Sequence, residues 1–404
     1  MLLLYIIGIK IYRTIIWLFS FFNQKAALFI QGRKQIFNQI TEKINPLDKK
    51  IWFHFASLGE FEQGRPVLEK IKSLHPEKKI IVTFFSPSGY EIRKNYALAD
   101  GIFYLPMDSY KNARRFLDII RPEIAIFTKY EFWYYYFKEL HNRKIPLYII
   151  SGIFRREQIF FKPYGGFYKR ILKYVSHFFV QNEESKVLLN SIGLNQVTVS
   201  GDTRFDRVYE NALNPKPISL IEKFCGNSKI LICGSTWTED EVLLANLTSK
   251  YPDWKFIIAP HEIDHHHLES IEKLFPKATL YTNLNQQIDL NLSSVLIINN
   301  IGMLSSLYQY GTVAYIGGGF GAGIHNTLEA AAFGLPVIFG PKYNKFQEAK
   351  DLLEINAAKS ISTIAALIMA FDDFKDNRTA SIAAQNYVAQ KKGATEIIIK
   401  QIDG

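Results

Sequence analysis

The sequence predicts an α/β protein built from two doubly wound halves in series. In each half, short apolar and β-branched runs alternate with stretches whose apolar residues have helical spacing. The runs show little polar alternation, which is typical of parallel strands buried on both faces. A polar stretch with two prolines, residues 211–219, reads as a linker, and the same alternation restarts after it.

Composition sets the class of protein and its partners. The 404 residues allow two domains of ordinary size, and 48% hydrophobic residues can build their cores. A net charge of +10 favours anionic partners: a nucleotide, a phosphorylated lipid or an acidic membrane face. No arginine-rich arm, zinc-finger spacing or RNP-type strand occurs, so nucleic acid is not expected. Two cysteines, Cys225 and Cys233, are too few for a disulfide framework and fit a reduced, cytosolic compartment.

Residues 1–24 form the first element, a strongly apolar stretch that Lys10 and Arg13 interrupt. No small-residue cleavage site follows, so a removed signal peptide is not expected. The stretch predicts a membrane-associated helix, and its composition leaves open whether it spans the bilayer or lies in the interface. An ordinary buried helix is the alternative.

The strands and helices of the first half follow in order along the chain. Helical patterns at 64–75 and 112–121 separate the earlier strands, and the segment 197–208 closes this half. The predicted strands lie in 50–57, 78–86, 100–106, 123–131, 145–152 and 177–182. In the second half they lie in 228–236, 254–262, 278–283, 294–300, 312–319 and 335–341.

Two glutamates stand where a strand of the first half gives way to a helix. Glu60 follows the first predicted strand, and Glu131 follows the strand in 123–131 beside Lys129 and a dense aromatic run. An acid at a helix start is favoured by the free N–H groups there, so Glu60 is either a helix-start residue or a general base. Carboxylates at two strand ends of one sheet are expected to face one cleft.

A basic and aromatic stretch follows the fifth predicted strand of this half. It contains Arg155, Arg156 and Lys162 and continues to Lys173. Such a surface suits an anionic amphiphile, and a solvated basic face is an equal alternative. We therefore take the first three of these cations as candidates for contacting an acceptor.

The glycine-rich segment Tyr315 to Pro341 is the most informative part of the second half. A strand runs into glycines at 317, 318, 319, 321 and 323, then His325 and Asn326, then a helical pattern. Glycine N–H groups such as that of Gly318 can approach a phosphate closely, and Glu329 can accept hydrogen bonds from a ribose. The spacing is neither a Walker A loop nor a dinucleotide fingerprint, and a tight structural turn is the alternative.

Two further strand ends of the second half carry polar residues. Ser235 and Thr236 stand where phosphate could sit or where a helix needs a cap, and these roles are compatible. Another strand ends at His261. The run His265 to His267 lacks supporting ligands at helical spacing, so a solvated helix face is favoured over a metal site.

Taken in order, these motifs resemble the 3-deoxy-D-manno-octulosonic acid (Kdo) transferases of lipopolysaccharide assembly. The resemblance covers nearly the whole chain after residue 24. It rests on ASLGEFEQGRPVL, TKYEFW, GDTRFD, GSTWTEDE, APHE, IGML, GGGFGAGIHNTLEAAAFGLPVIFGP and KFQEA.

The resemblance implies a GT-B glycosyltransferase: two Rossmann-like domains facing an interdomain cleft, with an N-terminal membrane-associated helix. It implies an inverting transfer of Kdo from CMP-Kdo to a lipid A precursor, lipid IVA, at the cytoplasmic face of the inner membrane, with neither metal nor cofactor. The expected organisation is a membrane anchor at 1–24, an acceptor domain at 25–210, a linker at 211–219 and a CMP-sugar domain at 220–404.

The family's motifs also imply roles for residues of this chain. Glu60 corresponds to the catalytic base, and Glu131 to a glutamate that supports the transition state. Arg204 stands where the family has a supporting lysine, so the charge is kept while its geometry differs. The implied CMP contacts are Pro260, His261, Gly302, Met303, Leu304, Asn326, Thr327, Leu328 and Glu329, and they join Ser235, Thr236 and Gly318 from the residue patterns.

Two of these contacts depart from the family pattern. His261 stands where arginine is common, which replaces a fixed cation by a titratable ring. Met303 stands where an acid is usual, so a backbone contact can survive there and a side-chain one cannot. There are two alternatives. One is another GT-B transferase that uses a different nucleotide sugar, such as a UDP-sugar, and the other is a non-catalytic nucleotide-sugar-binding membrane protein. Thermal stabilisation by CMP against UDP and GDP discriminates among them.

Overall fold

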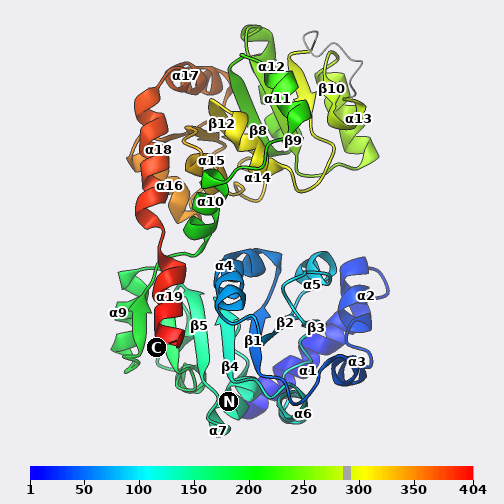
Figure 1. The fold of residues 1–404 in the computed structure, drawn as a ribbon, viewed down its shortest axis with the longest axis vertical. Helices are drawn as coiled ribbons and strands as arrows, with labels where there is room; N and C mark the ends of the chain where they lie inside the picture. Colours follow the sequence, from blue (N-terminus) through cyan, green and yellow to red (C-terminus); the bar gives the residue numbers. More distant parts are fainter. Residues whose placement is uncertain (285–292, 404) are drawn as a thin grey trace. The chain divides into compact units, whose positions relative to one another are not determined.

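The computed structural model describes residues 1–284 and 293–403, which form two compact units. Unit 1 comprises residues 1–206 and 393–404, and unit 2 comprises residues 207–392. Each unit contains a seven-stranded sheet in which every pair of neighbouring strands is parallel. Two doubly wound α/β units in series, as in the GT-B fold, are therefore confirmed (Figure 1).

Unit 1 has the strand order β3-β2-β1-β4-β5-β6-β7, with the direction of winding reversing between β1 and β4. Its strands are β1 (Lys50–Phe55), β2 (Lys79–Phe84), β3 (Gly101–Tyr104), β4 (Ile124–Thr128), β5 (Leu147–Gly152), β6 (His177–Val180) and β7 (Val197–Val199). Its helices are α1 (Leu2–Phe19), α2 (Gln24–Gln31), α3 (Ile36–Lys43), α4 (Leu58–Leu74), α5 (Pro87–Arg93), α6 (Tyr110–Ile120), α7 (Tyr134–Asn142), η1 (Ile159–Phe161), α8 (Gly166–Leu172), α9 (Glu183–Ser191) and α19 (Ala394–Asp403), while α10 (Arg204–Leu213) runs across the boundary.

The core of unit 1 explains why its strands read as continuous apolar runs. All six residues of β1 are buried. Trp52 packs in the core on one face of the sheet, and Phe53 and Phe55 pack in the core on the other. Because both faces are covered by helices, the strand needs no polar alternation.

Unit 2 has the order β10-β11-β9-β8-β12-β13-β14, with its reversal between β8 and β12. Its strands are β8 (Ile230–Thr236), β9 (Lys255–Pro260), β10 (Thr279–Leu280), β11 (Val295–Ile297), β12 (Val313–Ile316), β13 (Val337–Phe339) and β14 (Ala358–Ser360). Its helices are α11 (Ser219–Cys225), α12 (Thr238–Lys250), α13 (His265–Leu274), η2 (Tyr281–Asn283), α14 (Leu304–Leu307), η3 (Tyr308–Tyr310), α15 (Leu328–Ala332), α16 (Gln347–Glu354), α17 (Ile364–Phe374) and α18 (Arg378–Lys391).

The C-terminal helix α19 belongs to unit 1, whereas the sequence places residues 220–404 in one domain. Ile398 and Ile399 are buried in the core around β1, and α19 packs against α4 (Figure 1, red). Asp206 accepts hydrogen bonds from the amides of Gly393 and Thr395 at the start of the helix. The burial of Ile398 and Ile399 and the cap formed by Asp206 hold α19 on unit 1.

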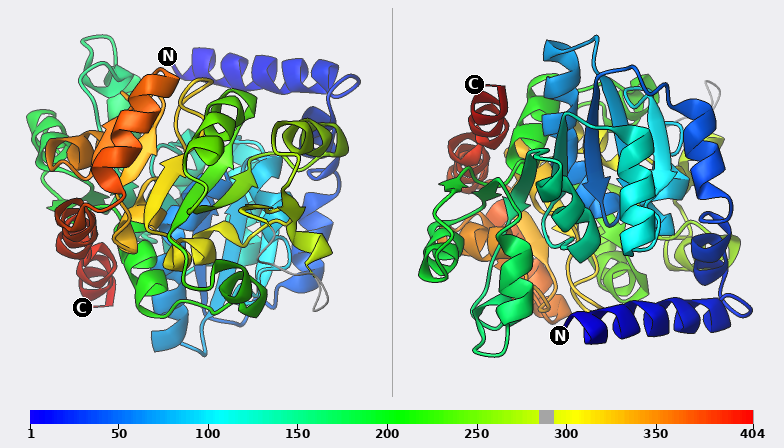
Figure 2. Two further views of the ribbon diagram at one scale, coloured as in Figure 1. Left: turned by 90° about the horizontal axis from the view of Figure 1, so that it is seen from above. Right: turned by 90° about the horizontal axis from the view of Figure 1, so that it is seen from below.

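Helix α1 is apolar and long enough to cross a membrane by length and composition, and none of its residues is buried. Figure 2 shows it as a straight helix that leads through a turn into α2. The hydroxyl of Tyr5 donates to Asp108 at 2.6 Å, and Asp108 also accepts from the amides of Tyr135 and Tyr136 at the start of α7. One side of α1 is thus attached to unit 1.

Candidate active site

Glu60 lies in the first turn of α4, just beyond the carboxyl end of β1. Its Oε2 accepts a hydrogen bond from the amide of Ala56 at 2.5 Å, which closes the turn between strand and helix. Burial, and after it the charge of Glu131, raise the pKa of Glu60 to about 7, although the amides of Ala56 and Ser57 and the charge of Lys129 lower it. A helix-start carboxylate with such a pKa can take a proton at neutral pH.

Glu131 follows β4, on the other side of the reversal in strand order. Its Oε2 accepts from Trp133 Nε1 at 2.8 Å and lies 3.3 Å from His54 Nε2. Glu60 and Glu131 are close enough for their charges to interact, as the pKa of Glu60 records. Both carboxylates thus follow the carboxyl ends of neighbouring parallel strands, at one edge of the sheet.

A buried polar chain on β1 and β2 orients Glu131. Trp52 Nε1 donates to Thr83 Oγ1 at 2.8 Å, and Thr83 Oγ1 lies 2.8 Å from His54 Nδ1. Thr83 Oγ1 also donates to the carbonyl oxygen of Phe53 at 3.4 Å, and His54 Nε2 faces Glu131 at the other end of this chain. His54 and Thr83 were not among the predicted site residues, although a histidine inside an apolar strand is a signal for such a partner.

Arg204 and Asp202 form the third part of this cluster, after β7. Arg204 contacts Asp202 Oδ2 through Nε at 2.9 Å and Nη2 at 2.8 Å, and Gln63 Nε2 donates to Oδ1 at 2.8 Å. Burial raises the pKa of Asp202, but Arg204 and, more weakly, Lys129 lower it further, so that it lies below its usual range. Since Lys129 acts on both Asp202 and Glu60, it lies within the cluster.

The candidate acceptor cations lie in the loop after β5. Arg155 and Arg156 are exposed and Lys162 is partly buried. Burial raises the pKa of Tyr130, the charge of Arg155 lowers it, and that of Glu60 raises it. Arg155 and Glu60 therefore both lie within electrostatic reach of Tyr130.

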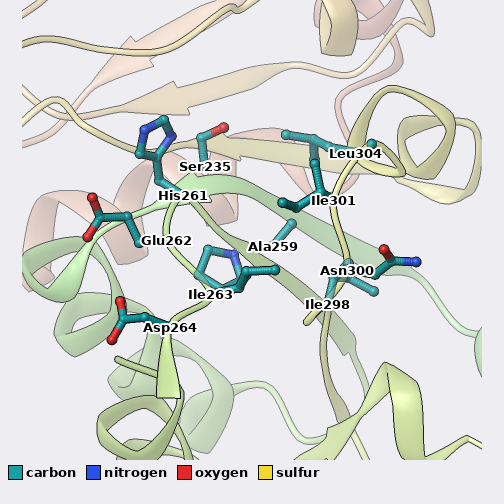
Figure 3. Close-up of a pocket in the computed structure, with 12 residues that line it drawn as sticks. Ser235, Ala259, His261, Glu262, Ile263, Asp264, Ile298, Asn300, Ile301 and Leu304 are labelled. Carbon is teal, nitrogen blue, oxygen red and sulfur yellow. The ribbon is translucent and has the colours of Figure 1, made fainter. Parts of the chain in front are cut away.

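Unit 2 contains a pocket of about 540 Å³ at the carboxyl ends of β8, β9 and β11. Five of the predicted CMP contacts line it: Ser235, Pro260, His261, Gly302 and Leu304. The remaining lining residues are Ala259, Glu262, Ile263, Asp264, Ile298, Asn300 and Ile301. Figure 3 shows Ser235 next to His261, and Glu262 and Asp264 along another edge. An apolar floor with polar edges suits a base and ribose.

The backbone of Ser235 has a positive φ of 53°, and the pairing of β8 with β9 shifts register beside it. Thr236, the next residue, is fully buried and does not line this pocket. Its hydroxyl donates to Glu241 Oε1 at 2.9 Å, and His267 Nε2 lies 3.2 Å from the same oxygen. The solvated-face interpretation therefore holds for the exposed His265 and is wrong for His267. Among the described residues no group of three ligands suits a metal.

Internal packing accounts for several glycines of the loop after β12. A Cβ at Gly317 would lie 2.2 Å from the carbonyl oxygen of Ser235, and one at Gly319 would lie 2.5 Å from Gly340 Cα. Gly318 and Gly323 have positive φ values of 90° and 140°. The amide of Gly318 donates to Asp240 at 2.9 Å, so this N–H is already used inside the protein.

The predicted contacts after the loop are arranged around Glu329. Asn326 donates to Glu329 Oε1 at 3.2 Å and accepts from the amide of Leu328 at 3.1 Å. Burial raises the pKa of Glu329, while Arg207 and Asn326 lower it. Thr327 and Leu328 are fully buried, and Met303 stands at the N-terminal end of α14.

Three aromatic rings link the glycine loop to the pocket. His261 stacks on Trp237 at 4.8 Å and on His325 at 4.4 Å. Trp237 Nε1 donates to His325 Nε2 at 3.1 Å, so this nitrogen is an acceptor and His325 is neutral. Burial and the neighbouring His261 lower the pKa of His325 to about 4. Neither Trp237 nor His325 was among the candidate residues.

Sequence comparison relates the chain to known transferases. Residues 30–207 match the family described as 3-deoxy-D-manno-octulosonic-acid transferase (kdotransferase). The 3-deoxy-D-manno-octulosonic acid transferase of Aquifex aeolicus is 27% identical over 316 residues, 76% of this chain and 80% of that protein. A bifunctional glycosyltransferase/methyltransferase of Fusobacterium nucleatum is 24% identical over 94% of this chain, which spans 60% of that protein's length.

Solved structures with this fold include UDP-GlcNAc 2-epimerases. The Neisseria meningitidis enzyme bound to UDP-GlcNAc aligns with a TM-score of 0.60 at 16% identity, over 87% of this chain and 99% of that one. The Methanocaldococcus jannaschii enzyme aligns with a TM-score of 0.58 at 15% identity, over 88% and 100%. This likeness concerns the fold alone. The family match and the sequence relatives, by contrast, indicate a glycosyltransferase similar to the Kdo transferases.

Proposed function

We propose that this glycosyltransferase is a Kdo transferase, which transfers Kdo from CMP-Kdo to a lipid A precursor, lipid IVA, in lipopolysaccharide synthesis. The observation that carries the proposal is the raised pKa of Glu60, about 7, in a carboxylate that lies beside Glu131. It lies in the part of the chain that matches the Kdo transferase family, residues 30–207. A membrane-associated helix and a net charge of +10 suit an anionic lipid acceptor at the cytoplasmic face of the inner membrane.

Glu60 is the proposed general base. A lipid hydroxyl attacks the anomeric carbon of Kdo, its proton passes to Glu60, and the bond to the CMP oxygen breaks with inversion. A base with a pKa near the working pH combines a useful ionised fraction with adequate proton affinity. Glu131 raises that pKa further, and His54 and Trp133 hold Glu131 in place.

Arg204 is the proposed electrostatic support. Its guanidinium is held by Asp202, so its position does not have to be established during the reaction. The exposed Arg155, with Arg156 and Lys162, is proposed to meet the acceptor, because these cations follow β5 on the same unit.

The pocket of unit 2 is the proposed CMP site. Its apolar floor suits the pyrimidine face, and Ser235 and His261 offer polar contacts at its edge. We propose that Asn326 and Glu329 contact the ribose. Thr236 and Gly318 support the neighbouring loops. The walls around the nucleotide are formed by Pro260, Gly302, Met303, Leu304, Thr327 and Leu328.

The test of donor identity is the shift in melting temperature on adding CMP, UDP or GDP to the full chain. A nucleotide at 100 times its Kd stabilises the folded state by about 2.7 kcal/mol. CMP should stabilise the protein at concentrations where UDP and GDP do not. Stabilisation by UDP alone would replace CMP-Kdo by a UDP-sugar donor.

A further inference from the structure

Unit 1 contains a second pocket, also of about 540 Å³, in which basic side chains gather. It is lined by residues of α1, α2, α3, the turn before α3, the loop after β3, and α6. Four cations line this pocket, which we call the basic pocket. They are Arg13, Arg33, Lys34 and Arg115. Asn38 and Asn112 add polar groups, and Trp17, Phe29 and Met107 add apolar ones.

Arg33 is the built-in centre of the basic pocket. Its guanidinium donates to the carbonyl oxygens of Leu105 at 2.9 Å, Phe29 at 3.0 Å and Phe85 at 2.7 Å. It also lies 3.7 Å from the ring centroid of Phe29 and 4.9 Å from that of Tyr104. Arginine has five N–H donors, so two remain after these three bonds. Burial lowers the pKa of Arg33 to about 10, which leaves it charged at neutral pH.

No acid neutralises this cluster within residues 1–284 and 293–403. None of the four cations forms an ion pair there, and the groups that raise the pKa of Arg33 are tyrosines and not carboxylates. A largely buried cation without a counter-ion is costly, and that cost is relieved when an anion binds. The arginine fork and three further cations match a doubly charged tetrahedral group such as a phosphomonoester.

Helix α1 presents an apolar surface next to the basic pocket. Its exposed apolar residues recur at helical spacing along one face: Leu4, Ile7, Ile11, Ile15 and Leu18. On the attached side, Tyr5 donates to Asp108 and Tyr12 contacts the rings of Phe29 and Phe85. A helix attached along one side with an apolar face outward suits the membrane interface, with nearby cations at the headgroup level.

We propose that the basic pocket binds the phosphomonoester headgroup of a membrane lipid. The site is connected to the carboxylate cluster through short contacts. Arg33 donates to the carbonyl of Phe85, whose ring lies 4.7 Å from that of Trp133, and Trp133 donates to Glu131 at 2.8 Å. A lipid held there lies close to the proposed catalytic residues. The inference concerns unit 1 alone and stands whichever sugar nucleotide unit 2 binds.

The test compares two triple variants of the full chain that remove the same charge. Arg33 stays unchanged, because it holds three backbone carbonyls and its loss could unfold the unit. The pocket variant carries Arg13→Gln, Lys34→Gln and Arg115→Gln. The control variant carries Lys10→Gln, Lys43→Gln and Arg114→Gln, which lie on α1, α3 and α6 and do not line the pocket. Circular dichroism and melting temperature establish that both variants fold.

The measurement is the affinity for phosphatidylcholine vesicles that contain phosphatidic acid, relative to vesicles with phosphatidylglycerol at equal surface charge. This ratio cancels the general attraction of about 1 kcal/mol per cation for an acidic membrane. We expect the wild type and the control variant to prefer phosphatidic acid by about tenfold, or about 1.4 kcal/mol, and the pocket variant to lose the preference. A preference that is absent in the wild type, or kept in the pocket variant, would overturn the proposal.

A second arm separates a lipid headgroup from free phosphate. Inorganic phosphate and a soluble short-chain phosphatidic acid are compared for their effect on the melting temperature of the wild type. We expect the lipid to raise it at a concentration at least about tenfold lower, because its acyl chains add apolar contact beside Trp17. Equal stabilisation by inorganic phosphate would make the pocket a free-phosphate site and refute the lipid assignment.

Discussion

Transfer activity should rise steeply through neutral pH if Glu60 is the base, because the pKa of Glu60 is raised to about 7. The base acts only when it is ionised. With a pKa of about 7, roughly one-tenth of Glu60 is ionised at about pH 6 and roughly nine-tenths at about pH 8. A carboxyl with an ordinary pKa of 4.5 would be almost fully ionised at both, so the structure predicts about a tenfold rise where an exposed glutamate predicts none.

The assay is the initial rate of Kdo transfer from CMP-Kdo at subsaturating donor, measured between about pH 5.5 and pH 8.5 in buffers of equal ionic strength. A thermal-shift titration with CMP over the same range serves as the control, since it reports donor binding without the base. The profile of Glu131→Gln should move to lower pH, because removing the neighbouring charge lowers the pKa of Glu60. A rate that is flat between about pH 6 and pH 8, or a profile that Glu131→Gln moves to higher pH, would refute the reasoning.

Three further predictions concern stability, donor binding and localisation. Because the folded-state pKa of Glu60 is raised, ionisation of Glu60 opposes folding as the pH rises above about 4.5. Glu60→Gln should therefore raise the free energy of unfolding by roughly 1–3 kcal/mol at about pH 8 and leave it unchanged at about pH 4, as urea denaturation can measure. The same substitution should lower turnover by about 10²-fold or more. Glu329→Ala should weaken CMP binding by roughly 1–3 kcal/mol in calorimetry, and unchanged affinity would favour a purely structural role beside Arg207. Deleting residues 2–20 should shift the protein toward the soluble fraction, and the shortened protein should still glycosylate detergent-dispersed acceptor. If the shortened protein folds and binds CMP but does not glycosylate that acceptor, the segment forms part of the acceptor site.

The strands were predictable because a strand that is buried on both faces has an apolar side chain at nearly every position. The run around Trp52 is apolar throughout, and the structure places it in the middle of the sheet. The strand β14 (Ala358–Ser360) was not predicted, since it is a three-residue edge strand containing a lysine. Helix α19 was assigned to the second half because its contact with α4 joins residues more than 300 positions apart, which no local pattern reveals.

The candidate site was predictable where a strand end alone positions a side chain. Glu60 and Glu131 follow β1 and β4, which are hydrogen-bonded neighbours at the reversal of strand order. The chain from Trp52 through Thr83 and His54 was not predicted, because it depends on the register between β1 and β2.

The basic pocket was also beyond local reasoning, because its parts come from distant segments. In the sequence, Arg33 is one cation among many near the N-terminus. Its three carbonyl partners, at Phe29, Phe85 and Leu105, meet only after α2 packs beside the ends of β2 and β3. The absence of an acid around it, among the residues that the structure describes, likewise becomes visible only in three dimensions.

The most direct test of the proposed function is a transfer assay with CMP-Kdo and a tetra-acylated lipid A precursor, read by the mass of the lipid product. We predict a product heavier than the acceptor by one or more Kdo residues with the wild type, and almost none with a folded Glu60→Gln variant that still binds CMP. Transfer from a UDP-sugar but not from CMP-Kdo, or undiminished transfer by Glu60→Gln, would contradict the account.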